Sequence, residues 1–429
     1  MLGALLLLCV YFSWATYHKE APAGREGAEQ LAAKLARGAK ASDRFIVVAQ
    51  GDESDASYAD ALAKELSSRG LHVAATVTGD PRTVRQALEA QLSVPVAGSV
   101  TVATNQACSQ WEMWSALREK DPAFKSLQVV APEPVGRSAF LSASNLRNVA
   151  DQIAVIAIIA VGMTMVIISS GIDLSVGSLV ALSAVITAWL IHRFGGAGAT
   201  SGVMLAAGAA AIAACAGVGV FSGVMITAFR IPPFIATLAM MQVASGIAFI
   251  IAQGQSIYDI PPRFTWLGRG AALITLPNAV VLMALVYIGA HLFMARTSLG
   301  RHIYAVGGNA EASRLSGVST KRTLIFVYLA SGLMAGIGGV IITSQLKAGA
   351  PTYGNMYELY VIAAVVVGGT SLSGGEGRIF GTLVGAFIIA VIRNGMNLVG
   401  VESYTQKVVL GVVILLAVML DMVKRRVKR

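Results

Sequence analysis

Two short glycine- and serine-rich segments interrupt long apolar stretches, so they place polar groups in a hydrophobic setting. The first runs from Gly171 to Gly177 (GIDLSVG) and the second from Gly369 to Gly375 (GTSLSGG). Both fit the pattern G-x-[D/S]-L-S-x-G, and an apolar stretch follows each. Such segments release backbone groups from helical hydrogen bonds, which a membrane tolerates only beside protein or a watery cavity. The pair predicts an internal repeat with broken helices, a pattern typical of a transport path.

Asp173 is the acidic residue of the first segment. A carboxylate at the bilayer centre costs about 2.5–3.5 kcal/mol, so we expect Asp173 to face the protein interior or lie near the interface. Asp173 and Ser175 either cap the helix that begins near residue 174 or line the path, and the two roles are compatible. Two asparagines deep in a later apolar stretch either face the pore or hold helices together. The candidate path residues are Asp173, Ser175, Gly177, Ser371, Ser373, Asn394 and Asn397.

The sequence offers little for catalysis or metal binding. Its three cysteines provide no disulfide framework, and its five histidines lack metal-ligand spacing. No Gly-Lys dipeptide occurs, so the chain has no phosphate-binding P-loop. The run Leu372–Glu376 is similar to the signature LSGGQ of ABC ATPases, but without a P-loop we do not interpret it as a nucleotide site. We expect no catalytic residue and no cofactor in this chain.

Composition assigns these motifs to a membrane protein. Of the 429 residues, 55% are apolar and 13% charged, whereas a soluble domain has about 25% charged residues. Residues 18–148 hold 15 Lys/Arg and 15 Asp/Glu, so the remaining 18 Lys/Arg and 8 Asp/Glu account for the whole net charge of +10. A basic excess between apolar stretches indicates membrane topology rather than nucleic-acid binding.

Ten apolar stretches approach the length of about 20 residues that a membrane-spanning helix needs. They are 2–17, 149–170, 174–192, 202–228, 232–252, 273–295, 322–345, the short 356–369, 379–398 and 404–422. Basic residues in loop 296–322 and in the tail 424–429 predict that both face the cytoplasm. The N-terminus is then inside and the segment 18–148 outside. Alternatively, residues 1–17 are the apolar part of a signal peptide, although its basic segment and cleavage site are missing.

The segment after the first span has a soluble pattern. We expect a linker or a short exposed helix over 18–44. Over 45–135 we expect a small α/β domain with a parallel sheet, because strand and helix patterns alternate there. The expected strands are 45–50, 71–77, 96–104 and 126–132, and the expected helices are 55–69, 82–92 and 107–119.

Ligands on parallel sheets bind at the carboxyl ends of strands, here Gly51–Asp55, Thr78–Asp80 and Thr104–Gln106. The pattern resembles one lobe of a periplasmic sugar-binding protein. Asp52, Asp55, Trp111 and Trp114 could contact a sugar, but they could equally cap, pack or face water. The insert therefore either binds a ligand or has a docking or vestigial role.

The basic loop 296–322 combines glycines with a short helical pattern. Gly307-Gly308-Asn309 can break the chain, and residues 310–316 can then form a short helix. This layout suits a polar partner docked beneath the membrane. Lipid headgroups alone would explain the basic charge but not the helix and the glycines. The run from Glu311 to Gly317 is also similar to the EAA---G pattern with which ABC permeases engage their ATPases.

Five stretches resemble the permease subunit of ribose/xylose/galactose-type ABC importers, and more distantly the branched-chain amino acid permeases. They occur in family order as FLSASNLRNV (140–149), AVGMTMVIISSGIDLSVGS (160–178), RIPPFIATLAMM (230–241), GRHIYAVGGNAEASRLSGV (300–318) and VVGGTSLSGGEGRIFGTLVGA (366–386). The resemblance implies that 138–429 form a polytopic α-helical transmembrane domain in the bacterial inner membrane. Its implied partners are the lipid bilayer, a second copy, two ATPase subunits that carry ATP and Mg²⁺, and a periplasmic sugar-binding protein, with no nucleic acid.

The resemblance also implies an ATP-driven permease for a pentose or hexose, working by alternating access as the 306–318 segment moves. The implied ATPase-coupling residues are Gly307, Gly308, Asn309, Glu311, Ala312, Arg314 and Gly317. Family members have a short connection where this chain inserts about 120 residues, so the insert could shield, guide or partly replace the binding protein.

Two other functions fit part of the pattern. An ion-coupled carrier would also have repeats and broken helices, but it usually needs several acids or bases within the membrane, and Asp173 is nearly alone. A membrane sensor would use the insert to bind a ligand while the spans only signal. Neither alternative explains the layout of loop 296–322.

Overall fold

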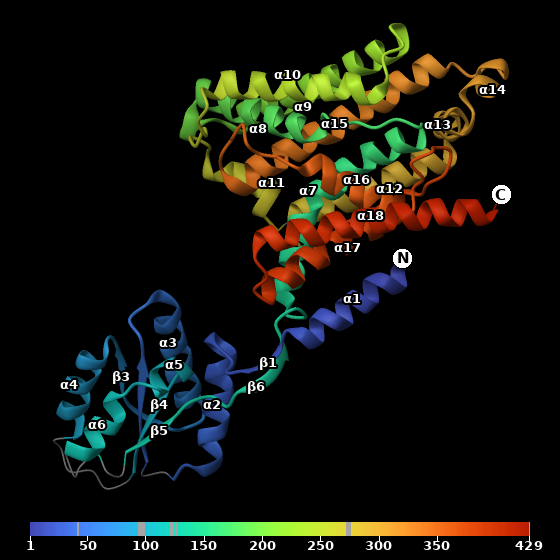
Figure 1. Cartoon of the computed structure of the whole chain (residues 1–429). Coiled ribbons are helices and arrows are strands. Elements are labelled where there is room, and N and C mark those ends of the chain that lie inside the picture. The colour runs from blue at the N-terminus through green and yellow to red at the C-terminus, as the bar shows by residue number, and fades with distance from the viewer. Residues whose placement is uncertain (41–42, 93–98, 121–123, 125–126, 272–275, 429) are drawn as a thin grey trace. The chain divides into compact units, whose positions relative to one another are not determined.

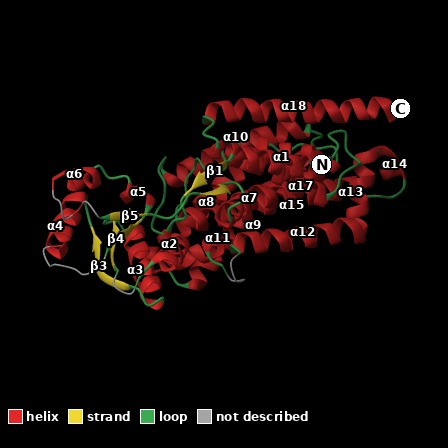
Figure 2. Ribbon diagram, turned by 90° about the horizontal axis from the view of Figure 1, so that it is seen from below, coloured by secondary structure: helices red, strands yellow, loops and turns green. Residues whose placement is uncertain are grey.

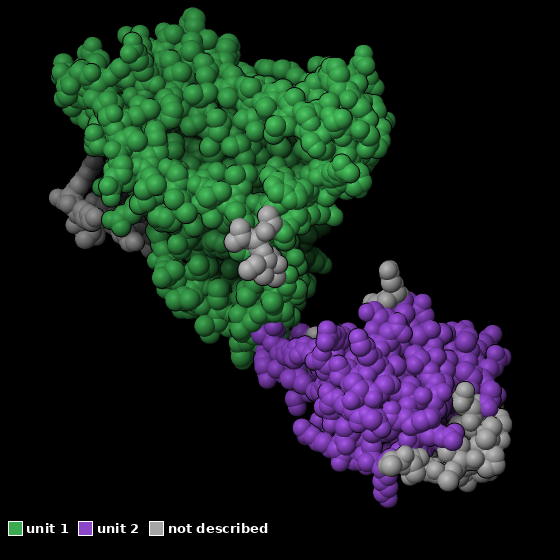
Figure 3. Space-filling view, turned by 180° about the vertical axis from the view of Figure 1, so that it is seen from behind, with its two compact units in different colours: residues 1–16, 139–429 green, residues 17–138 purple. Residues whose placement is uncertain are grey.

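The chain is described by a computed structural model that divides into two compact units, coloured separately in Figure 3. A helical unit is formed by Met1–Thr16 together with Ala139–Arg429, and an inserted unit by Tyr17–Ser138. The structure describes all residues except 41–42, 93–98, 121–123, 125–126, 272–275 and 429. The starts of two expected strands and of one expected span, at 96–98, 126 and 273–275, lie outside the described residues.

Each of the ten apolar stretches is helical (Figure 1). Their bounds are α1 Leu2–Ala15, α7 Ala143–Ile168, α8 Val176–Arg193, α9 Ser201–Ala228, α10 Pro233–Ala252, α12 Asn278–Arg296, α15 Thr320–Leu346, α16 Tyr357–Val367, α17 Ile379–Leu398 and α18 Ser403–Lys428. Among the described residues, seven of these helices are long and apolar enough to cross a membrane. The shorter apolar helices are α1, α16 and the part Ser403–Met419 of α18. The fold is thus a polytopic helical membrane protein, with seven helices of full spanning length where we expected about ten.

Burial separates the central helices from the peripheral ones. In the most apolar window of α7, 89% of the residues are buried, against 22% in that of α10. The helices α9 and α15 approach each other through glycines: a Cβ on Gly219 would overlap the carbonyl of Tyr328, and one on Gly332 would overlap that of Cys215. Small residues at helix crossings are typical of membrane proteins, where close van der Waals packing drives helix association.

Contacts between loops agree with the predicted alternation of the spans across the membrane. The segments after α10 and α15 pair through Ile257 and Gly349, and the topology places both outside. The segment after α7 meets the end of α13, Ser298–Gly308, where Ser170 donates a hydrogen bond to the carbonyl of Gly307 (2.9 Å), and the topology places both inside. Short helices occur in these connections: η2 Gly196–Gly198, η3 Pro262–Thr265, α11 Trp266–Arg269, α13 Ser298–Gly308 and α14 Ala310–Leu315.

The inserted unit contains the expected parallel sheet, with strand order β3-β2-β4-β5. In the part of the chain that the structure describes, all strands belong to this unit (Figure 2). The strands of the sheet are β2 Arg44–Ala49, β3 His72–Thr78, β4 Val100–Thr104 and β5 Gln128–Val130. The helices between them are α3 Glu53–Ser68, α4 Pro81–Leu92, α5 Gln106–Ser109 and α6 Met113–Lys120.

Strand β2 is apolar on both faces because helices cover both sides of the sheet. Phe45 and Val47 pack with Leu62 of α3 on one side. Ile46 and Val48 pack with residues of α4 and α6 on the other side. Alternate residues of a strand point to opposite faces, so the run FIVVA serves two cores at once.

Residues 18–44 do not form the expected linker. They include most of the strand β1, Tyr17–Glu20, and the helix α2, Gly24–Gly38. Ala28 and Leu31 of α2 are fully buried in the same core as α3. Their small size and the surrounding Ala/Gly-rich composition obscured the helical spacing of these residues. The helix α2 is therefore part of the domain.

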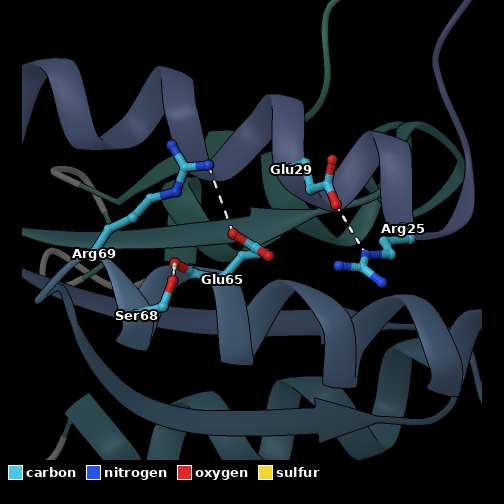
Figure 4. Close-up of polar contacts among 5 residues, drawn as sticks. All are labelled: Arg25, Glu29, Glu65, Ser68 and Arg69. Carbon is cyan, nitrogen blue, oxygen red and sulfur yellow. Dashed lines mark hydrogen bonds and ion pairs between the residues drawn. The ribbon is translucent and has the colours of Figure 1, made fainter.

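Figure 4 shows α2 beside α3, with polar contacts on each helix. Arg25 pairs with Glu29 on α2 (2.9 Å), and Glu65 pairs with Arg69 at the end of α3 (3.6 Å). Ser68 donates its hydroxyl to the backbone carbonyl of Glu65 (2.9 Å). Pairs of this spacing contribute only a few tenths of a kcal/mol, so the buried apolar faces hold the two helices together.

The chain enters and leaves the inserted unit through a two-stranded antiparallel ribbon. Strand β1 pairs with β6, Val135–Ser138, with Tyr17 opposite Ser138. Within the helical unit, the carbonyl of Thr16 accepts a hydrogen bond from the amide of Ala139 (3.2 Å). The hydroxyl of Thr16 accepts one from the amide of Phe140 (3.1 Å). Because entry and exit lie side by side, the connection between α1 and α7 stays short despite the insertion.

We expect Leu62→Ala to lower the free energy of unfolding of the inserted unit by about 2–5 kcal/mol, because it opens a cavity at a fully buried site. Pulse proteolysis of the full-length protein in urea measures this change. Lys64→Ala, on the exposed side of the same helix, should leave the stability unchanged. Equal losses in both variants would contradict the assigned core.

Candidate functional site

Break 1, residues 169–175, separates α7 from α8, and protein groups satisfy its unwound backbone. Ser170 has a positive φ of 64°, and the amide of Gly171 donates back into the last turn of α7 (2.9 Å), a closure common at helix C-termini. Thr237 of α10 donates its hydroxyl to the carbonyl of Ile172 (3.3 Å). The backbone is thus bonded by the protein, as burial in a membrane requires.

Asp173 lies buried in break 1, and its carboxylate accepts three hydrogen bonds. One oxygen accepts the amide (2.9 Å) and the hydroxyl (2.6 Å) of Ser175, the residue that precedes α8. The other accepts the hydroxyl of Ser331 on α15 (2.7 Å). Donors of this kind compensate for the burial of a polar group. Asp173 therefore orients the start of α8 and attaches break 1 to α15.

Gly177, in the first turn of α8, packs against the residues that precede α16. A Cβ at this position would lie 2.5 Å from the carbonyl oxygen of Gly354 and would also overlap the carboxylate of Glu358. Gly354 itself has a φ of 72°, a conformation that glycine adopts without steric cost. Gly177 is thus explained by close packing, whether or not it lines a path.

Break 2, residues 368–378, separates α16 from α17 and folds into a tight loop. The amide of Ser371 donates to the carbonyl of Glu376 (3.0 Å), and the hydroxyl of Ser371 accepts the amide of Ser373 (3.1 Å). Ser371 is buried and Ser373 is exposed. Break 2 starts like break 1, with a left-handed residue (Gly369, φ 84°) after the helix, and then continues for several more residues.

The end of α13 meets both breaks at one point. The amide of Gly375 in break 2 donates to the carbonyl of Ile168 at the end of α7 (2.8 Å). The hydroxyl of Ser170 contacts the carbonyls of Gly307 (2.9 Å) and Ser373 (3.1 Å). Tyr304 of α13 donates its hydroxyl to the carbonyl of Gly377 in break 2 (2.9 Å). We call this meeting point the glycine joint.

Glycines allow the backbones to approach in the glycine joint. A Cβ on Gly307 would overlap the carbonyl of Ile168 and lie 2.8 Å from the amide nitrogen of Gly375. A Cβ on Gly375 would lie 2.9 Å from the Cα of Gly308. By contrast, a Cβ on Gly308 would meet no atom within 4 Å. The two adjacent glycines of α13 therefore differ: Gly307 is required by contact and Gly308 is not.

The basic loop, 296–322, contains the short helix that the sequence predicted. Asn309 separates α13 from α14, and its side-chain oxygen accepts the amide of Ala312 (2.9 Å), a standard N-cap bond. Gly317 follows α14 with a φ of 82°, which glycine favours. The predicted short helix at 310–316 is confirmed as α14, and the preceding helix α13 was not foreseen.

The exposed face of α14 carries a close ion pair. Arg314 contacts Glu311 at 2.5 Å, one turn earlier on the helix. The guanidinium holds the pKa of the Glu311 carboxyl below its ordinary value, so this carboxylate stays charged at neutral pH. Ala312 between them is also exposed. The helix thus presents both charges to its surroundings.

The two predicted path asparagines contact neighbouring helices. Asn394 of α17 exchanges two side-chain hydrogen bonds with Asn145 of α7 (2.8 and 2.9 Å). The side-chain oxygen of Asn397 accepts a hydrogen bond from the side-chain amide of Gln406 on α18 (2.6 Å). Of the two roles that the sequence left open, these contacts fit the holding of helices together.

Three residues of the site were missed by sequence reasoning. Ser331 gave no signal, because its spacing in an apolar helix does not reveal that it faces Asp173. Tyr304 was read as part of a loop, although an amphipathic pattern in residues 298–308 could have revealed α13. Ser170 could have been found, since it holds the position after a helix where glycine is usual.

Two acidic residues at the predicted ligand edge of the inserted unit are helix caps. Asp52 accepts the amide of Asp55 (2.7 Å) at the start of α3, and Asp80 accepts that of Thr83 (2.8 Å) at the start of α4. This bond lowers the pKa of Asp80. Trp114 is buried and donates its indole N–H to the backbone carbonyl of Cys108 (2.7 Å). No group of three or more His, Cys, Asp or Glu able to hold a metal ion occurs among the described residues.

Comparison with known proteins decides the family. Residues 145–418 match the family model described as the permease component of branched-chain amino acid transport systems. The match covers more than half of the chain and includes both breaks and the basic loop, 296–322. The chain belongs to this permease family. The permease is thus a multi-pass protein of the inner membrane and a transport subunit, not an enzyme.

Curated relatives agree with this assignment. The ribose import permease protein of Escherichia coli (strain K12) is 45% identical over 286 residues, 66% of this chain and 87% of that protein. A probable ABC transporter permease protein of Sinorhizobium fredii is 36% identical over 281 residues (66% and 82%). The xylose transport system permease protein of E. coli (strain K12) is 34% identical over 352 residues (67% and 87%). No solved structure matches the chain.

We expect Asp173→Ala to lower the thermal stability of the purified permease, because it leaves the Ser175 amide and the Ser331 hydroxyl without their acceptor. Each unsatisfied buried group costs about 1–3 kcal/mol. Asp173→Asn keeps one acceptor oxygen and should fall between wild type and Asp173→Ala. A thermal unfolding scan in detergent measures the order, and wild-type stability in Asp173→Ala would contradict the network.

The two adjacent glycines at the end of α13 provide a matched pair for the glycine joint. Gly307→Ala should lower the unfolding temperature and the yield of folded permease, because its Cβ overlaps the Ile168 carbonyl. Gly308→Ala adds the same methyl group in open space and should leave both unchanged. Equal tolerance of the two substitutions would show that the backbones do not approach as described.

Proposed function

We propose that the permease is the membrane-spanning subunit of an ATP-driven ABC importer for a monosaccharide of the pentose or hexose class. The glycine joint carries this proposal, because it connects loop 296–322, the coupling loop of this proposal, to both unwound segments by direct contact. A displacement of α13 cannot leave break 2 unchanged while Tyr304 is hydrogen-bonded to it and Gly307 packs against Gly375. The relatives named for ribose import and xylose transport support the substrate class.

The ATPase subunits dock on the exposed side of α14 in this proposal. Glu311, Ala312 and Arg314 are exposed there, and the apolar side chain of Leu315 is 78% exposed. In the docked complex, Leu315 would supply an apolar contact surrounded by charged and polar side chains, the arrangement of an interface core and its rim. Gly308, Asn309 and Gly317 shape the two ends of the helix. ATP and Mg²⁺ belong to those partner subunits.

The substrate path runs along the two breaks. Asp173, Ser175 and Gly177 contribute the first segment, and Ser371 and Ser373 the second. Asp173 holds break 1 to α15 through Ser331, so break 1 acts as the fixed side against which break 2 moves. Alternating access then results from movement of break 2 relative to break 1. No bond of the substrate is made or broken.

Asn394 and Asn397 do not line the path in this mechanism. Their amide groups bond to α7 and α18, so they hold α17 against its neighbours while break 2, at the other end of α17, moves. The Asn145–Asn394 pair is partly buried, so separating it costs free energy. We therefore assign both residues a fastening role.

The other proposed partners are a second copy of the permease and a periplasmic sugar-binding protein. The inserted unit lies on the extracytoplasmic side. The basic charge of the coupling loop supports this placement, and so do the contacts between Ile257 and Gly349 and between Ser170 and Gly307. Asp52 and Asp80 of the inserted unit are engaged as helix caps. This favours a role in shielding or guiding the binding protein over a ligand site of its own.

We expect Glu311→Arg to reduce substrate-stimulated ATP hydrolysis by about ten-fold or more, a loss of about 1.4 kcal/mol or more in coupling. The substitution places a second cation beside Arg314 and so disrupts the charge pattern of α14. Hydrolysis is measured in proteoliposomes that contain the permease, its co-purifying ATPase subunits, a sugar-binding protein and D-ribose.

Asp60→Arg makes the same charge change at an exposed position of α3 in the inserted unit and should leave stimulated hydrolysis unchanged. Both variants should reach the membrane in wild-type amounts. Full stimulation in Glu311→Arg would show that α14 is not the point of transmission. Uptake that ignores ATPase inhibition but collapses with the ion gradient would favour an ion-coupled carrier.

A further inference from the structure

Ser170 holds a backbone conformation that normally belongs to glycine. Its φ is 64°, in the left-handed region that costs free energy for every residue with a Cβ. It directly follows the last turn of α7, where glycine is the usual residue. At the matching position after α16 the chain has Gly369, with a φ of 84°. A serine at this place therefore needs a reason other than the turn.

The hydroxyl of Ser170 provides that reason. It lies 2.9 Å from the carbonyl oxygen of Gly307, at the end of α13, and 3.1 Å from that of Ser373, in break 2. A serine hydroxyl has one proton to donate, so the two carbonyls share it. The hydroxyl bridges two segments that come from distant parts of the chain.

The packing around Ser170 leaves this bridge little freedom. A Cβ on Gly374 would overlap the Ser170 hydroxyl and lie 2.7 Å from the carbonyl oxygen of Gly307. The amide of Gly375 donates to Ile168, two residues before Ser170 (2.8 Å). A shift of Gly307 is therefore felt by Ser170 and by break 2 together.

We infer that Ser170 is a positioning residue that transmits movement of the coupling loop to break 2. The inference rests on the proposed function, since it presumes that an ATPase moves α13 and α14. When the Gly307 carbonyl moves away, the Ser170 hydroxyl donates more strongly to the Ser373 carbonyl, and when it returns, the hydroxyl donates more strongly to Gly307. Break 2 is thereby held or released according to the position of the coupling loop. Without the hydroxyl, Gly307 and Ser373 lose this shared bond, while the Tyr304–Gly377 bond between α13 and break 2 remains.

The test compares two serine substitutions in the full-length permease with its ATPase subunits in lipid nanodiscs. Ser170→Gly keeps the left-handed backbone without strain and removes only the bridging hydroxyl. Ser169→Ala is the matched control, because the Ser169 hydroxyl bonds to Val166 within α7 (2.8 Å). Hydrogen exchange of residues 371–377 is measured with and without a non-hydrolysable ATP analogue, and D-ribose uptake per ATP hydrolysed is measured in proteoliposomes.

In the wild type and in Ser169→Ala, we expect the ATP analogue to change exchange in 371–377. In Ser170→Gly, this change should fall by about three- to ten-fold, the range expected from the loss of one hydrogen bond, and uptake per ATP should fall with it. Binding of the ATPase subunits and basal hydrolysis should stay at wild-type levels.

The outcomes separate this inference from the proposed function. If the wild-type chain binds no ATPase subunit, the proposed function is wrong and the inference falls with it. If the wild type responds to the nucleotide and Ser170→Gly responds equally, the proposed function stands and the inference alone is overturned. An equal loss in Ser169→Ala would also overturn it, since that hydroxyl does not bridge the segments.

Discussion

The structure depends on one constraint: backbone that leaves a helix inside a membrane must find its hydrogen bonds in the protein. Break 2 meets it by donating the Gly375 amide to the Ile168 carbonyl at the end of α7. Break 1 meets it through Asp173, which receives three donors, two from its own segment and one from α15. The bonds from Gly375 to Ile168 and from Tyr304 to Gly377 satisfy unwound backbone and also fix where break 2 meets α7 and α13.

The inserted unit is accommodated by a second, simpler constraint. Its first and last strands pair, so a separate three-layer domain with its own cores interrupts the chain while α1 and α7 stay connected by a short ribbon. The family match begins at residue 145, after this unit. The permease domain and the inserted unit can thus be understood separately, each from its own pattern of burial.

Local patterns predicted much of this architecture. The glycine–serine repeats marked both breaks, Asn309 and Gly317 marked the ends of α14, and the alternation of strands and helices marked the parallel sheet. Contacts between distant segments were not predictable, because periodicity does not show which neighbour a side chain meets. Asn394 could not be assigned between pore and packing until Asn145 was seen opposite it, and the small buried residues of α2 hid a helix in an apparent linker.

The central claim is that this chain moves its substrate only when another protein drives the coupling loop. Flux of radiolabelled D-ribose into proteoliposomes tests it most directly, with the permease alone and with ATPase subunits, a sugar-binding protein and ATP added. The account predicts uptake in the complete system and none with the permease alone, even down a steep ribose gradient. Uptake by the purified chain without any ATPase would contradict it.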